Sequence, residues 1–216
     1  MSILHLLDDS DFEEMIITTN IGIKLINREM GKSTLPENIK IQIDRILKGQ
    51  SHKEKTLSIV EKIVEIRRSI KNIFKDKGIK NVFQSNEDVV YLLKPCNNEY
   101  DFNNFILVMC GIINKDLEGF KKIVTMPDGR TGSIVALEEY LKSEYGENTY
   151  NPAIITNLRD IFTLRSQKFP IHVDTTEWMK KVVSLGFVPP INWQGLGFKC
   201  LELYFESISN TFTKIL

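Results

Sequence analysis

The chain has few cysteines, few histidines and no excess of either charge. Its three cysteines, Cys96, Cys110 and Cys200, are widely separated and show no Cys-x-x-Cys spacing. We therefore expect neither a disulfide scaffold nor a structural zinc site, and we predict no metal and no cofactor. A formal net charge of zero over 216 residues argues against a protein whose whole surface binds nucleic acid or acidic lipid.

Long apolar runs are also missing. No segment approaches the roughly twenty apolar residues that a membrane span needs. Residues 1–9 have no positively charged region before their short apolar run, which argues against an export signal. We therefore expect no membrane partner and a cytoplasmic location. The 42% hydrophobic and 26% charged composition is ordinary for a globular chain with one well-buried core, or a core with a smaller subdomain.

Helical signals dominate what is present. Apolar residues at helical spacing, with capping and stop residues, predict helices over 10–30, 36–49, 51–78, 102–113, 134–145, 152–169, 174–186 and 192–216. The segment 89–93 fits either a short strand or a helical turn. The turn chemistry of residues 126–130 is consistent with a small β-hairpin near 123–134. The fold class is therefore mainly α, a multi-helix bundle. Residues 1–80 form either a separate helical subdomain or part of the same bundle.

Basic residues gather in one region. Between residues 37 and 80 there are twelve Lys or Arg and six Asp or Glu. Arg67, Arg68 and Lys71 lie toward the end of a predicted helix and are our candidate RNA-binding residues. The other interpretation is a solvated helix end whose cations complement the helix dipole.

One arginine lies in the apolar stripe of its predicted helix. With Ile154 as zero and about 100° per residue, the stripe of the 152–169 helix spans about 340° to 100°, and Arg165 falls at about 20°. A guanidinium aimed into an apolar seam needs a partner, a core edge, a cleft or another chain. His172 precedes the next helix, where a helix N-terminus favours anions. The two side chains could converge on one phosphate.

A second Arg and His pair shows that spacing alone is a weak argument. Arg45 and His52 have the same separation in sequence. Relative to Ile39, however, Arg45 falls at about 240°, away from its own apolar stripe. The direction of the arginine, rather than the spacing, therefore distinguishes Arg165.

The run Arg165-Ser166-Gln167-Lys168-Phe169-Pro170-Ile171-His172, with helices on both sides, resembles the HEPN superfamily, whose mark is Arg, four to six residues, then His. The likeness covers about 150–216 directly and, by helical content, 84–216, which we take as a HEPN-like domain. The chain departs from the family in having Ser166 directly after the arginine and Pro170 within the motif.

The resemblance implies a metal-independent endoribonuclease, often a toxin or an anti-phage defence component, that acts as a homodimer. In that interpretation His172 is the general acid or base and Arg165 stabilises charge on the phosphate, while Ser166 supplies a polar contact and Lys168 steers the RNA backbone. RNA and an antitoxin or defence partner protein are the implied partners.

Two other interpretations remain open. Many members of the superfamily bind ligands or partners without cleaving RNA, so the chain fits a non-catalytic HEPN-like binding or protein-interaction module as well. The resemblance could also be accidental, in which case Arg165 forms a core-edge salt bridge with Asp160 or Glu177. Several aromatic residues fit either base stacking or the core, namely Trp178, Trp193, Phe198 and Tyr204.

Overall fold

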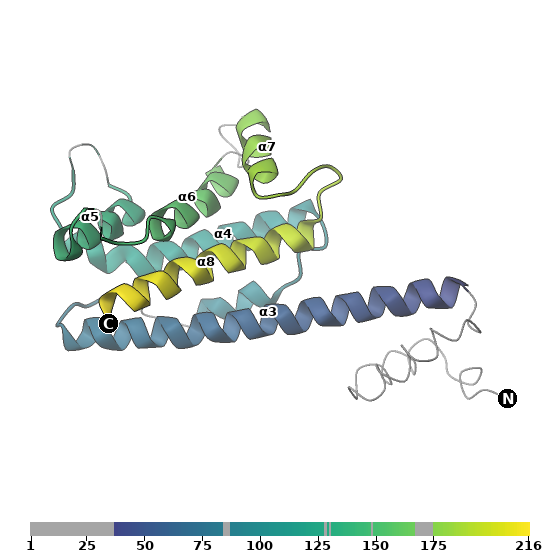
Figure 1. Ribbon diagram of the computed structural model, residues 1–216, viewed down its shortest axis with the longest axis horizontal. Helices are drawn as coiled ribbons and strands as arrows, with labels where there is room; N and C mark the ends of the chain where they lie inside the picture. The colour runs from purple at the N-terminus through teal and green to yellow at the C-terminus, as the bar shows by residue number, and fades with distance from the viewer. Residues whose placement is uncertain (1–36, 84–86, 128, 130, 148, 167–174) are drawn as a thin grey trace. The chain divides into compact units, whose positions relative to one another are not determined.

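We describe the fold from a computed structural model (Figure 1). The structure describes residues 37–83, 87–127, 129, 131–147, 149–166 and 175–216, with the backbone alone for 37–48, 50, 166 and 175. The chain divides into two compact units, Met1–Lys55 and Thr56–Leu216. The division falls within the first described helix, whereas the sequence suggested a boundary near residue 80.

The described residues are mainly helical, as expected, and contain no strand. The elements in chain order are α3 (Glu37–Asp76), the 3-10 helix η2 (Glu87–Leu93), α4 (Glu99–Leu117), the 3-10 helix η3 (Glu118–Lys122), α5 (Ser133–Tyr145), α6 (Ala153–Ser166), α7 (Thr175–Ser184) and α8 (Trp193–Ile215). The helix expected over 10–30 lies outside the described residues.

Two local expectations differ from the structure. Residues 37–76 form one helix, so Gly49 does not separate two helices as predicted. Glycine costs only about 1 kcal/mol inside a helix, which the neighbouring turns can offset. The described residues of 123–134 form turns and the start of α5, with no strand pairing; residues 128 and 130 are outside the description. The hairpin is therefore not confirmed.

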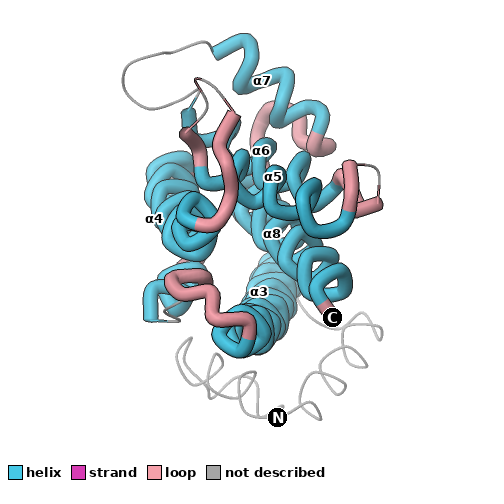
Figure 2. Tube along the Cα trace, turned by 90° about the vertical axis from the view of Figure 1, so that its left-hand side faces the viewer, coloured by secondary structure: helices cyan, strands magenta, loops and turns pink. Residues whose placement is uncertain are grey.

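Helices α4, α6 and α8 form the centre of the unit Thr56–Leu216 (Figure 2). Helix α6 packs most extensively against α8 and also contacts α4, α5 and α7. Its apolar face is buried at the positions that the stripe predicted, including Ile154, Leu158 and Ile161. Burial of such side chains contributes about 1.5–3 kcal/mol each, so this packing is the main source of stability for the bundle.

Asparagine residues begin three of these helices. Asn98 accepts a hydrogen bond from the N–H of Asp101 in α4, and Asn192 accepts one from the N–H of Gly195 in α8, each at 3.0 Å. Asn151 accepts from the N–H of Ala153 at 3.0 Å, directly before α6. These bonds satisfy N–H groups that have no partner within the helix.

The second half of α3 shares the core of this unit. Ile63, Ile70 and Phe74 are fully buried. Phe74 makes edge contacts with the rings of Phe120 and Tyr140, with centroids 5.2 and 5.5 Å apart. Residues 56–76 therefore share a core with η3 and α5, and this explains why the division lies N-terminal to them.

Candidate functional site

Arg165 lies in the last turn of α6, and its side chain is partly exposed. Burial raises the pKa of the Cys110 thiol in α4 to about 12, while the positive charge of Arg165 acts to lower it. The charge of Arg165 thus acts on a thiol of α4. Its partial exposure leaves Arg165 open to solvent, as a group that handles a phosphodiester must be.

The other residues of the Arg/His motif are not placed. His172 and Lys168 lie outside the described residues, and Ser166 is described only by its backbone, as the last residue of α6. The convergence of Arg165 and His172 therefore stays a prediction.

The carboxylates suggested as structural partners of Arg165 pair with lysines. Asp160 accepts a hydrogen bond from Lys181 at 2.6 Å, which links α6 to α7. Glu177 accepts one from Lys180 at 2.5 Å within α7. Both carboxylates therefore have a lysine partner in the structure.

The basic region of α3 needs one correction. Arg68 and Lys71 are exposed, as expected for an RNA-binding face or a solvated helix end. Arg67 is only 2% exposed and cannot be part of that surface. With Ile63 as zero and about 100° per residue, Arg67 falls at about 40°, next to the buried Phe74 at about 20° and on the same side as Ile70 at about 340°. Its direction places it in the core stripe.

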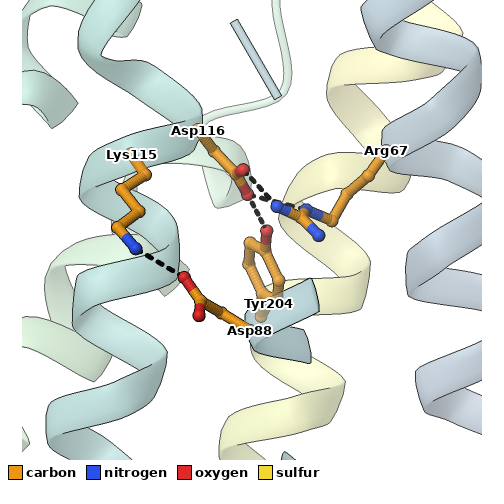
Figure 3. A network of polar contacts seen from close by, with 5 residues as sticks. All are labelled: Arg67, Asp88, Lys115, Asp116 and Tyr204. Atoms are coloured by element: carbon orange, nitrogen blue, oxygen red, sulfur yellow. Dashed lines mark hydrogen bonds and ion pairs between the residues drawn. The ribbon is translucent and has the colours of Figure 1, made fainter. Parts of the chain in front are cut away.

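Arg67 belongs to a buried polar network that joins three helices (Figure 3). Its Nε and Nη2 donate to the two carboxylate oxygens of Asp116 in α4, at 2.9 and 2.5 Å. The hydroxyl of Tyr204 in α8 donates to the same carboxylate. Asp116 and Tyr204 are 0% and 1% exposed. The bidentate geometry identifies a charge-assisted pair, and Tyr204 occupies the core rather than a base-stacking position.

Burial and pairing oppose one another in this network. Burial raises the pKa of Asp116, and the hydrogen bonds from Arg67 and Tyr204 only partly offset it. Burial acts to lower the pKa of Arg67, but Tyr204 and Asp116 outweigh this effect and raise it. Burial and the neighbouring Asp116 hold the pKa of Tyr204 well above its usual value. The network is therefore sensitive to the loss of any one member.

A pocket of about 540 Å³ lies beside this network. Arg67 lines it together with an apolar wall at Ile112 and five polar residues, Asn81, Asp88, Asn114, Lys115 and Glu118. The volume falls within the range of about 300–1,000 Å³ that is usual for small-molecule sites. Sequence reasoning missed this pocket, because its walls come from segments that are far apart in the chain.

The loop at one side of the pocket has an unusual backbone. Asn81 and Phe83 have φ values of 67° and 50°, in the left-handed region that residues other than glycine rarely adopt. The N–H of Phe83 donates to the carbonyl oxygen of Asp116 at 3.0 Å. A Cβ on Gly119 would lie 2.6 Å from the carbonyl oxygens of Lys80 and Asn81. The loop is thus held against α4 and η3 by backbone contacts that require Gly119.

Comparison with known proteins identifies no relative. No family model matches the chain, and neither a curated protein nor a solved structure matches it. Function must therefore be argued from the residues themselves.

The described residues show neither a metal site nor a membrane span. No group of three or more His, Cys, Asp or Glu in this part of the chain is arranged to hold a metal ion. None of its helices combines the length and the apolar composition needed to cross a membrane.

Proposed function

We propose that the chain is a HEPN-like, metal-independent endoribonuclease that cleaves RNA with Arg165 and His172. The proposal is supported by Arg165, which lies in the apolar stripe of α6 by sequence, is partly exposed in the last turn of that helix and acts electrostatically on Cys110 of α4. In sequence, His172 belongs to the connection between α6 and α7, two helices that pack against each other.

The proposed chemistry needs only an acid or base and a cation. A histidine with a pKa near its usual value of about 6.5 can take a proton from the ribose 2′-OH or give one to the leaving oxygen. The guanidinium of Arg165 stabilises the charge that develops on the phosphate. Ser166 supplies a polar contact and Lys168 steers the RNA backbone. Each proton-transfer role contributes about 10²–10⁴ in rate.

RNA cleavage in the presence of EDTA tests this proposal. The full chain should cut RNA without added metal, and Arg165→Ala and His172→Ala should each lower the rate at least about 10²-fold with little change in melting temperature. Arg159→Ala is the matched control, because Arg159 lies on the same helix, is half exposed and pairs with Glu138. This control should cleave at the wild-type rate.

Two outcomes would contradict the assignment. One is a wild-type protein that leaves RNA intact in EDTA. The other is cleavage by Arg165→Ala and His172→Ala at the wild-type rate. Loss of activity in the Arg159→Ala control as well would assign the effect to damage of α6 rather than to catalysis.

The homodimer is part of the same proposal. If two copies contribute to one catalytic site, mixing Arg165→Ala with His172→Ala protein should restore part of the activity through mixed dimers. Light scattering should show a dimer under the same conditions. A monomer with full activity would contradict the proposed homodimer.

A non-catalytic interaction module is the second candidate. It is favoured by neighbouring apolar side chains on η2, where Val90 and Tyr91 are 58% and 50% exposed. Adjacent exposed apolar residues of this kind are frequent at protein contacts. In this case the protein should leave RNA intact, while Val90→Ser and Tyr91→Ser should weaken a complex with an antitoxin or defence protein. We propose a cytoplasmic location for either function.

A further inference from the structure

The pocket beside Arg67 presents charges of both signs. Two of its lining residues, Lys115 and Asp88, pair with each other at 2.5 Å, and Glu118 is a further acidic lining residue. The guanidinium of Arg67 is held by the carboxylate of Asp116 (Figure 3). The pocket therefore has no excess of positive charge that would select an anion alone.

The pair between Lys115 and Asp88 is open to solvent. The two side chains are 69% and 38% exposed. Exposed ion pairs are weak, so a ligand can replace this one at little cost. Substituting Lys115 or Asp88 leaves no buried charge without a partner, whereas substituting Arg67 or Asp116 does.

The charge pattern discriminates between classes of ligand. A ligand with only a negative group would approach Lys115 but would lie near Asp88 and Glu118. A ligand with only a positive group would approach Asp88 but would lie near Lys115 and Arg67. A small molecule that carries both charges can pair with Lys115 and Asp88 together and leave neither unpaired.

The remaining lining residues offer two amide groups and an apolar wall to a ligand. Ser133 donates to Oδ1 of Asn114 at 2.7 Å, which fixes the orientation of that amide. Asn81 provides a second amide, and Ile112 provides an apolar wall. The loop that holds Asn81 is fixed by the bond from Phe83 to Asp116. The walls are therefore organised before any ligand arrives, which lowers the entropy lost on binding.

The geometry points to a site for a small zwitterion of the free amino acid class, with its carboxylate on Lys115 and its ammonium group on Asp88. This site is separate from Arg165 and His172. Ligand binding at this site does not depend on the proposed RNA cleavage.

Calorimetry on the full chain tests this inference with the twenty free amino acids as probes. At least one should bind with a Kd below about 1 mM. Its N-acetyl derivative, which lacks the positive charge, and its carboxamide, which lacks the negative charge, should each bind about two- to fivefold more weakly, since each loses one solvent-exposed charged contact.

Variants locate the binding. Lys115→Met and Asp88→Asn should each raise the Kd about two- to fivefold, because each removes one solvent-exposed charged contact of the ligand. Lys199→Met is the control, since Lys199 forms an exposed pair with Glu202 on α8, and it should leave the Kd unchanged. Absence of binding by all twenty probes, equal binding of the singly charged derivatives, or binding that survives both pocket variants would each overturn the inference.

Discussion

Arg67 of α3 and Asp116 of α4 form a bidentate ion pair in which both side chains are almost completely buried. Because Tyr204 of α8 donates to the same carboxylate, Asp116 connects three helices that are distant in sequence. The backbone carbonyl of Asp116 also holds the loop at Phe83. One residue thus ties the helix packing to the wall of the pocket.

Asp116→Asn should destabilise the protein strongly. The substitution leaves the Arg67 guanidinium buried without its carboxylate, and breaking a buried pair in this way costs about 3–5 kcal/mol. Urea unfolding measures the change. Arg159→Ala, which removes an exposed pair with Glu138, should change the free energy of unfolding by only about 0–1 kcal/mol. Equal effects of the two variants would show that the buried pair has no special role.

Tyr204→Phe tests the third member of the network separately. The variant keeps the buried ring and removes only the hydroxyl that donates to Asp116. We expect a loss of about 1–3 kcal/mol in the free energy of unfolding, since hydrogen bonds to charged groups are stronger than neutral ones. A loss below about 0.5 kcal/mol would mean that Arg67 alone satisfies the carboxylate.

Gly119→Ala should destabilise the protein, whereas Gly111→Ala should not. A Cβ on Gly119 would overlap the carbonyl oxygens of Lys80 and Asn81, which are backbone atoms that cannot rotate away. Overpacking of this kind costs about 1–3 kcal/mol. Gly111 lies in α4 with no atom within 4 Å of the added Cβ, and alanine there should stabilise the helix by about 0.5–1 kcal/mol. Thermal unfolding of both variants checks the opposite signs.

Helical periodicity was sufficient to predict most helices, because their apolar stripes are regular and their capping residues are distinct. The predicted stripe of α6 agrees with the structure. The prediction of two helices in place of the long α3 was wrong at Gly49. A single glycine costs only about 1 kcal/mol inside a helix and does not by itself end it. Tertiary context overrides such local preferences.

The buried network could have been suspected from the sequence. Arg67 lies in the same direction as Ile63, Ile70 and Phe74, which is the criterion that distinguished Arg165 from Arg45. Applied to α3, the criterion predicts an inward cation with an acidic partner. The identity of that partner could not be predicted, because Asp116 follows Arg67 by 49 residues and only the packing of α4 brings them together.

The three cysteines provide a prediction about reactivity. All are buried and free. Burial raises the pKa of Cys96 and of Cys110 to about 12 and raises that of Cys200 further. Thiolates are the reactive form, so the native protein should not react with Ellman's reagent near pH 8, and all three thiols should react in guanidinium. Rapid reaction of the native protein would show that the core around these residues opens.

The same raised pKa values predict a loss of stability at alkaline pH. A thiol that ionises near pH 9.0 when unfolded and near pH 12 when folded contributes stability that is complete below pH 9. This contribution is lost as the pH rises from about 9 toward about 12, because only the unfolded state releases the proton in that interval, at up to about 1.4 kcal/mol per pH unit for each thiol. Cys110→Ala should therefore lose stability less steeply than the wild type over this interval, even if its stability at neutral pH is lower. Urea midpoints between pH 8 and pH 10.5 measure the slope, and identical slopes for the two proteins would contradict the assignment to Cys110.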